Sequence, residues 1–392
     1  MSISPWPSYD EEQIKAVSAV LETGKVNYWT GSLCKSFEDE FSSWCKTRFS
    51  VALANGSLAL SSAYLASGLK PGDELITTPR TFIATASSAV LLKINPIFAD
   101  VDINSGCITA KNIEPLITKR TRAISVVHLG GWPADMQSIC ELAKAYDLKV
   151  IEDCSQAHGA RILINGDWRS VGTFGDVSAW SFCQDKIIST GGEGGMISTN
   201  SEEIWNLIWS FKDHGKSWSK VHNQKHPPGF RWLHNRFGSN FRLTEIQSAI
   251  GRIQLKRLQD WNLVRTQNAN ILIEALTDCS AIRVPIPPSN VHHAWYKFHC
   301  YVNTDELLDG WSRDRIVYEI NSIGFPAFHG SCSEIYLETC FQNSGLVPKH
   351  RLKNARQLGE SSLMFLVHPT IDSDQMSTYA SAIKSVMKFA CK

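Results

Sequence analysis

The chain has 392 residues, of which 43% are hydrophobic and 20% are charged, as is typical of a globular protein long enough for two domains. Its formal net charge of +1 provides no bulk electrostatic attraction to nucleic acid or to an anionic membrane, so neither is an expected partner. No apolar run reaches the roughly 18 residues of a transmembrane helix, and the N-terminus has neither the basic nor the apolar region of a secretory signal.

The chain begins with a predicted amphipathic helix over residues 8–23. Gly24 follows the last apolar position, where a glycine commonly ends a helix. The apolar positions at helical spacing are Ile14, Val17, Val20 and Leu21.

A strand–turn–helix unit follows. A short apolar run over 50–54 breaks at Asn55-Gly56 and continues as a helix-like stretch to Gly68. Small residues that open a helix expose backbone N–H groups at the positive end of the helix dipole, so Gly56 and Ser57 are candidates for binding a phosphate. The same pattern also fits an ordinary junction between a strand and a helix.

From about residue 50 to residue 200, short apolar strands alternate with helix-like runs. The predicted strands include 74–77, 95–99, 123–127, 149–151, 177–181 and 195–198. This alternation is typical of βαβ units and predicts a mostly parallel sheet covered by helices.

Asp153 follows one of these strands, at the edge of the sheet where ligands bind in open α/β folds. A carboxylate in that place can keep a pyridinium nitrogen protonated, which makes a pyridoxal ring an electron sink. Asp153 could also be a turn or N-cap residue without any ligand.

Lys186 lies between two β-like runs, just ahead of the glycine-dense turn 191–195. A lysine amine can form a Schiff base if it is partly neutral, and burial near other cations lowers its pKa in that direction. Most lysines are solvated surface charges, so one lysine alone is a weak signal. The order along the chain is more specific: a phosphate turn, then Asp153, then Lys186, then a glycine turn.

The last third of the chain begins with a polar stretch over 213–238, which predicts a long functional or mobile loop. Apolar residues at helical spacing follow from Leu243 toward Leu263. A second domain with a strand within 295–302 comes next, and we place the domains at 1–260 and 261–392.

Eleven cysteines are scattered along the chain without a Cys-x-x-Cys pair. This distribution argues against a disulfide framework and against a zinc site. It predicts reduced thiols in the cytoplasm and no bound metal.

These motifs resemble those of the DegT/DnrJ/EryC1/StrS sugar aminotransferases, which depend on pyridoxal phosphate and belong to fold-type I. The resemblance extends from residue 26 to Pro369. Its most specific pieces are 71–74, 81–86, 152–159, 181–195 and 238–247. It implies an α/β fold with a mostly parallel, seven-stranded sheet covered by helices in the large domain, and a smaller C-terminal α/β domain.

The resemblance also implies how the cofactor ring is held. Lys186 would carry pyridoxal phosphate as a Schiff base and move protons as general base and acid. Asp153 would pair with the pyridine nitrogen, Gln156 would bind the ring hydroxyl, and Phe82 would stack on the ring. Without the resemblance, Phe82 would be taken for a core residue.

The phosphate would be bound by Gly56, Ser57 and Ser181, again by resemblance. Asn240 matches a residue that reaches the phosphate from a neighbouring subunit. The chain is therefore expected to form a homodimer with shared active sites.

By the same resemblance, the reaction is a transamination with L-glutamate as amino donor, in which the cofactor alternates with its pyridoxamine phosphate form. One branch of the family consists of dehydratases with His in place of the lysine, and Lys186 disfavours that branch. A non-catalytic cofactor-binding regulator is a remote alternative, against which the intact set of Asp153, Gln156 and Lys186 argues.

Two segments depart from the commonest family pattern, at 227–234 and 325–336. They resemble a subgroup that makes 8-amino-3,8-dideoxy-D-manno-octulosonate, the amino form of the lipopolysaccharide sugar Kdo, from 8-oxo-Kdo. The carboxylate of this acceptor suits arginine and histidine contacts. The candidate contacts are Arg231, His234, His329 and Ser331. A solvated surface position explains Arg231 equally well, and a polar loop at the domain junction explains His329 and Ser331 equally well.

The alternative acceptor is a nucleotide-linked 4-keto-6-deoxyhexose for an O-antigen or a capsule. It would need a groove for the base and the diphosphate. His292, His293, Trp295 and Tyr296 could form that groove, or could be the packing face of a strand.

Overall fold

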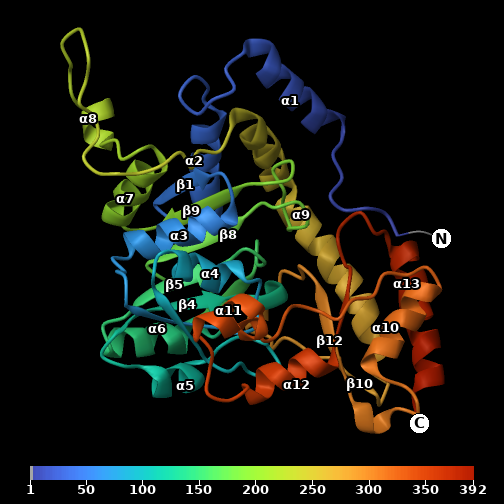
Figure 1. The fold of residues 1–392 in the computed structure, drawn as a ribbon. Helices are drawn as coiled ribbons and strands as arrows, with labels where there is room; N and C mark the ends of the chain where they lie inside the picture. The colour runs from blue at the N-terminus through green and yellow to red at the C-terminus, as the bar shows by residue number, and fades with distance from the viewer. Residues whose placement is uncertain (1–2) are drawn as a thin grey trace.

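The computed structural model describes residues 3–392 (Figure 1). Its centre is a seven-stranded sheet in the order β1-β9-β8-β5-β4-β2-β3. The strands are β1 (Phe49–Leu53), β2 (Glu74–Thr77), β3 (Asn95–Phe98), β4 (Thr121–Val127), β5 (Lys149–Asp153), β8 (Val177–Ser181) and β9 (Gly195–Thr199). Only β9 runs antiparallel to its neighbours, which confirms the predicted α/β class with a mostly parallel sheet.

Both faces of this sheet are buried. Successive side chains of a strand point to opposite faces, and so Met196 packs in the core beside α2 (Leu33–Cys45) while Ile197 packs beside α3 (Gly56–Ala66) and α7 (Glu202–Lys212). This burial explains why the strands appear in the sequence as short continuous apolar runs.

The remaining elements of the first half surround the sheet. They are α1 (Glu11–Thr23), α4 (Ala84–Leu91), α5 (Ala110–Ile113), α6 (Met136–Ala145), α8 (Trp218–His222), and the hairpin β6 (Arg161–Ile164) with β7 (Asp167–Ser170), which pairs with β11 (Val291–His292). Gly24 ends α1 with a φ of 66°, as the sequence predicts.

A second core lies in the C-terminal third, between Ala269 and Ala390. Its elements are an antiparallel sheet of β10 (Ile282–Arg283), β12 (Phe298–Val302) and β13 (Ser362–Phe365), with α10 (Arg313–Ser322) and α13 (Ser373–Ala390). The helices α11 (Thr339–Ser344) and α12 (Lys353–Ser361) also belong to this third, but their buried residues Phe341 and Leu358 pack in cores of the first region. This region lies beside the large sheet in Figure 1.

The helix α9 (Glu245–Leu276) connects the two regions and runs without a break across the predicted boundary after residue 260. It begins with a capping box between Thr244 and Gln247. It contacts α1 and α2 in the first region and α13 in the second. The boundary itself stays a prediction.

Two local predictions differ from the structure. The segment 213–238 is not all loop, because the short helix α8 starts after the N-cap Ser217 and places Trp218 against Trp205 and Trp209. The predicted strand within 295–302 starts only at Phe298, because Trp295 has a φ of 46° and cannot continue a strand.

Within residues 3–392, none of the helices combines the length and the apolar character needed to span a membrane.

Candidate active site

A cavity of about 850 Å³ lies where β1, β2, β5 and β8 end. These strands are parallel to one another, so their C-terminal ends meet at the edge of the sheet where α/β proteins bind ligands. Its lining includes Asn55, Gly56, Ser57, Thr81, Phe82, Thr85, Asp153, Ser155, Gln156, Ser181, Cys183, Asp185 and Lys186 from the large sheet, and Tyr296, Lys297, Phe328, Gly330, Ser331 and Met364 from the C-terminal third.

One end of the cavity is the start of α3. The side chain of the N-cap Asn55 accepts a hydrogen bond from the backbone N–H of Leu58 at 2.9 Å, whereas the N–H groups of Gly56 and Ser57 have no acceptor within the helix. A Cβ on Gly56 would lie 2.7 Å from the Cβ of Ser181, so only glycine lets these two segments approach. Backbone donors at a helix start beside a serine hydroxyl could hold a phosphate group.

The carboxylate of Asp153 is buried and oriented by two donors. Its Oδ2 accepts a hydrogen bond from the hydroxyl of Thr85 at 2.8 Å, and its Oδ1 accepts one from the backbone N–H of Ser155 at 3.1 Å. The Thr85 hydroxyl is also 3.0 Å from that of Thr81. A fixed carboxylate in the wall of the cavity could hold a protonated ring nitrogen.

Lys186 lies in the connection between β8 and β9, and its side chain is only 14% exposed. Its Nζ is 3.3 Å from the hydroxyl of Tyr296 and 3.8 Å from Oδ1 of Asp185. Its backbone carbonyl accepts a hydrogen bond from Nε1 of Trp6 at 2.8 Å. Tyr296 and Asp185 therefore hold the amine inside the cavity, and Trp6 fixes the backbone of the same residue.

Tyr296 and Asp185 also bind each other, because the Tyr296 hydroxyl donates to the Asp185 carboxylate. Burial raises the pKa of Tyr296 well above its usual value, so the hydroxyl keeps its proton. Burial alone would raise the pKa of Asp185, but the charge of Lys186 and the bond from Tyr296 outweigh it and lower that pKa. The group beside the amine is thus a carboxylate.

Two further predicted cofactor residues line the same cavity. Oε1 of Gln156 accepts a hydrogen bond from the backbone N–H of Gly130 at 2.7 Å, which leaves the amide NH₂ group as a donor. Phe82 is 68% exposed, so it is not a core residue and its ring is available at the cavity. The phosphate cradle formed by Gly56, Ser57 and Ser181, the Asp153 carboxylate, the Lys186 amine and the Phe82 ring together fit pyridoxal phosphate.

Four predicted site residues do not line the cavity of the single chain: Arg231, His234, Asn240 and His329. Arg231 and His234 are exposed in the segment 213–238, which projects from the body of the molecule together with α8 (Figure 1). Asn240 is exposed too, and its backbone forms a bridge with that of Asp213.

The other two predicted acceptor contacts separate in the structure. Ser331 lines the cavity. His329 does not, because its side chain is 58% exposed and forms an ion pair of 3.4 Å with Asp314 on the surface. As acceptor contacts, both remain predictions.

Sequence reasoning missed Thr85, Asp185 and Lys297 as site residues, and assigned Tyr296 no part beside Lys186. Asp185 directly precedes Lys186 in the chain, which could have suggested it. Tyr296 reaches Lys186 across 110 residues, and no local pattern reveals such a contact.

A cluster of His128, Glu152 and Cys154 lies close to Asp153 and has the composition of a metal site. The ligand atoms of His128 and Glu152 are already in use, because Nδ1 of His128 accepts from the N–H of Ala134 at 3.1 Å and Nε2 pairs with Glu152 at 3.1 Å. The Glu152 carboxylate also accepts the backbone N–H groups of Gly172, Phe174 and Gly175. This network of hydrogen bonds positions the chain around Asp153.

Comparison with known proteins agrees with this site. Residues 7–384 match the model of the DegT/DnrJ/EryC1/StrS aminotransferase family. The crystal structure of an aminotransferase from Psychrobacter cryohalolentis is similar with a TM-score of 0.96 and 49% identity, covering 98% of this chain and 99% of that one. The structure of NtdA from Bacillus subtilis with bound cofactor PMP has a TM-score of 0.83 and 26% identity, covering 99% of this chain and 86% of that one.

Among curated proteins, the dTDP-3-amino-3,6-dideoxy-alpha-D-galactopyranose transaminase of Aneurinibacillus thermoaerophilus is 36% identical over 300 residues, which is 76% of this chain and 77% of that protein. The match to the family model covers nearly the whole chain, including every part of the cavity. The chain therefore belongs to the DegT/DnrJ/EryC1/StrS family and is a sugar aminotransferase that depends on pyridoxal phosphate.

Proposed function

We propose that this enzyme transfers the amino group of L-glutamate to the keto carbon of a nucleotide-linked hexose. The observation that carries the proposal is the convergence of Lys186, Asp153 and the Gly56–Ser181 cradle on one cavity. The similarity to a transaminase named for a dTDP-linked sugar supports the nucleotide.

In this proposal the residues of the chain have separate tasks. Gly56, Ser57 and Ser181 bind the phosphate, Asp153 binds the ring nitrogen, and Phe82 and Gln156 orient the ring. The bound cofactor supplies an electron sink for the negative charge that develops on the substrate carbon.

Lys186 moves the proton of the transamination at its Nζ, which is neutral when it accepts the proton and charged when it returns it. The Tyr296 hydroxyl, 3.3 Å away, orients the amine toward the cavity. Tyr296 is itself fixed by its bond to Asp185, so the amine meets a preorganised partner.

The second candidate acceptor is 8-oxo-Kdo, which would place the enzyme in the synthesis of lipopolysaccharide. The observation in its favour is that the segment 325–336, which resembles the amino-Kdo subgroup, contributes Phe328, Gly330, Ser331 and Cys332 to the wall. A wall of this kind could set which sugar fits.

A coupled assay separates the two acceptors. The purified enzyme, loaded with cofactor, is given L-glutamate with either 8-oxo-Kdo or a panel of nucleotide-linked 3-keto and 4-keto hexoses, and 2-oxoglutarate is followed. Turnover with a nucleotide sugar alone supports the first proposal. Turnover with 8-oxo-Kdo alone contradicts it and selects the second.

We also propose that the enzyme is a homodimer in which Asn240 of each chain completes the site of the other. In support, the segment 213–238 exposes Phe230, Trp232 and Phe237, the last of them by 99%. Exposed apolar side chains gathered on one projecting segment are typical of a surface that another chain covers.

Complementation tests this arrangement. If sites are shared, dimers mixed from Lys186→Ala and Asn240→Ala chains have one site with both defects and one with neither. Mixing two inactive variants then restores activity, and light scattering reports the mass of a dimer. Failure of the mixture to regain activity, or an active monomer, contradicts the shared site.

A further inference from the structure

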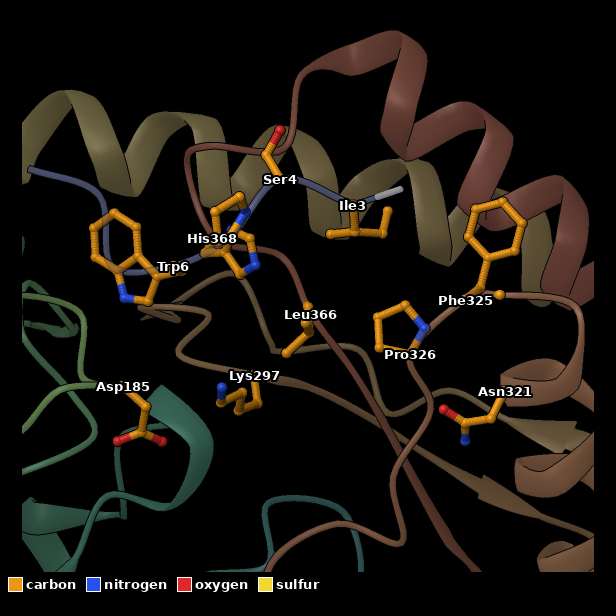
Figure 2. A pocket seen from close by; sticks show the side chains of 12 residues that line it. Ile3, Ser4, Trp6, Asp185, Lys297, Asn321, Phe325, Pro326, Leu366 and His368 are labelled. Atoms are coloured by element: carbon orange, nitrogen blue, oxygen red, sulfur yellow. The ribbon is translucent and has the colours of Figure 1, made fainter. Parts of the chain in front are cut away.

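A second cavity, of about 580 Å³ (Figure 2), shares part of its lining with the Lys186 cavity. One side is formed by the N-terminal residues 3–6 and the other by the C-terminal third. Its lining consists of Ile3, Ser4, Pro5, Trp6, Asp185, Lys297, Asn321, Gly324, Phe325, Pro326, Leu366 and His368. Asp185 and Lys297 line both cavities, so the two spaces meet at these side chains.

Lys297 is the unpaired cation at this junction. Among residues 3–392 no carboxylate forms an ion pair with its ammonium group, because the nearby carboxylate of Asp185 binds Tyr296 and Lys186. In Figure 2 its amino end points toward the side of the cavity on which Asp185 lies. A partly buried charge without a partner is costly unless an anion from outside binds it.

The charge of Lys297 persists at neutral pH. Burial lowers its pKa to about 8, as do the charges of Arg265 and Lys186, while Asp185 acts in the opposite direction. A group with a pKa of about 8 is mostly protonated at pH 7. The junction therefore presents a positive charge in the working range of most enzymes.

Apart from Lys297 and the Asp185 carboxylate, the side chains that line the second cavity carry no charge. The rings of Trp6 and His368 stack at 6.1 Å on one side, and Phe325, Pro326 and Leu366 lie across from them (Figure 2). Burial lowers the pKa of His368 to about 3, so its ring is neutral. Lys297 is thus the one cation of a largely apolar lining whose one carboxylate, Asp185, already binds Tyr296 and Lys186. A cation in such surroundings attracts an anion more strongly than the same cation in water does.

Lys297 also lies close to the reacting amine. The Nζ atoms of Lys186 and Lys297 are 4.8 Å and 4.9 Å from the centre of the Tyr296 ring. Both lysines also line the 850 Å³ cavity, so one molecule bound there can contact both nitrogens.

We propose that Lys297 and the second cavity form a binding site for the anionic end of a substrate, a carboxylate or a phosphate, whose reacting group lies at Lys186. The site rests on the transamination proposed above. The carboxylate would come from the amino-acid donor, and the phosphate from a nucleotide-linked acceptor.

The test compares Lys297→Met, which keeps the length of the side chain and removes the charge, with Lys297→Arg, which keeps the charge. Lys111→Met, at an exposed position in α5, is the matched control. Circular dichroism and cofactor absorbance establish that each variant is folded and loaded.

Direct binding is measured first, with glutarate and inorganic phosphate as probes that cannot be transaminated. Calorimetry on the loaded enzyme gives Kd for each. We expect Lys297→Met to weaken one of the two by about 10- to 100-fold, as for loss of a hydrogen bond to a charged group, and Lys297→Arg by only a few-fold.

Kinetics then identify which substrate supplies the anion. A rise in KM for L-glutamate in the half-reaction assigns the site to the donor, and a rise in KM for the acceptor assigns it to the acceptor. Unchanged Kd for both probes and unchanged KM for both substrates would overturn the site. If the wild type reacts with L-glutamate but aminates no acceptor of the panel, the proposed acceptor fails while the binding test of Lys297 still stands.

Discussion

The two walls of the active-site cavity are assembled in different ways. On the cofactor wall, Gly56 and Asp153 lie at or just beyond the ends of strands in one parallel sheet, so the sheet itself sets their positions. On the opposite wall, Tyr296 and Ser331 come from the C-terminal third and meet the first wall only through long-range packing. The first wall has the general features of cofactor binding, and we expect specificity for the sugar to depend on the second.

The largest expected effect is on the cofactor wall. Lys186→Ala removes the amine that transfers the proton, so turnover should fall by about 10⁴-fold, the upper range for general acid–base catalysis. A coupled assay for 2-oxoglutarate measures it, with Lys111→Ala as the control. Turnover within tenfold of the wild type would show that another group transfers the proton.

Gly56→Ala tests the cradle of the same wall. The new Cβ would lie 2.7 Å from the Cβ of Ser181, so the start of α3 must move away from β8. Overpacking of this kind costs about 1–3 kcal/mol, and we expect the Kd of pyridoxal phosphate to rise by about 10- to 100-fold. Titration by absorbance gives the Kd.

Ser61→Ala, in the same helix but outside the cavity, is the control for that titration. An unchanged Kd in Gly56→Ala would mean that the phosphate does not bind at the start of α3.

The buried side chain of His158 should make the free energy of unfolding depend on pH. Burial, followed by the charges of Lys186 and Arg265, lowers the pKa of His158 from 6.5 to about 3. Between these values the unfolded chain binds a proton that the folded chain does not, so stability falls as the pH decreases from 6.5 toward 3. From pH 7 to pH 5 this group alone should reduce the free energy of unfolding by about 2 kcal/mol.

Urea unfolding at the two pH values measures the loss. His158→Leu, which cannot take up a proton, should lose less stability over the same interval. An equal loss in the variant and the wild type would assign the acid sensitivity to other groups.

The smallest expected effect is on the opposite wall. Tyr296→Phe removes the hydroxyl beside the Lys186 amine but keeps the ring, so kcat should fall by about tenfold, as for one hydrogen bond to a charged group. The Kd of the cofactor should stay the same. Tyr318→Phe, at an exposed tyrosine, is the control. A change in the Kd with an unchanged kcat would make Tyr296 part of the cofactor wall.

The same contrast explains what could be predicted from sequence. Strand ends and helix starts follow from local patterns, and so the sequence singles out Gly56, Asp153 and Lys186 and predicts strand limits close to those observed. The structure brings these three residues together in one cavity. The contact between Tyr296 and Lys186 depends on how α9 places the C-terminal third against the sheet. Only the folded chain fixes that distance.

Other differences have similar causes. The helix α8 is too short to show a periodic pattern, and its tryptophan packing involves α7. His329 stays a predicted acceptor contact, but its exposed side chain pairs with Asp314 and does not line the cavity of the single chain. His329 therefore lies at the surface, whereas Ser331, two residues later in the same loop, lines the cavity.

The N-terminal segment also constrains the synthesis of the enzyme. Trp6 bonds to the carbonyl of Lys186, and the carbonyl of Pro5 accepts from the hydroxyl of Thr370, which follows it by 365 residues. The Pro5 contact therefore forms only after Thr370 has been synthesised. A nascent chain can fold its sheet early, but the N-terminal segment beside Lys186 reaches its final contacts only after residue 370 has emerged.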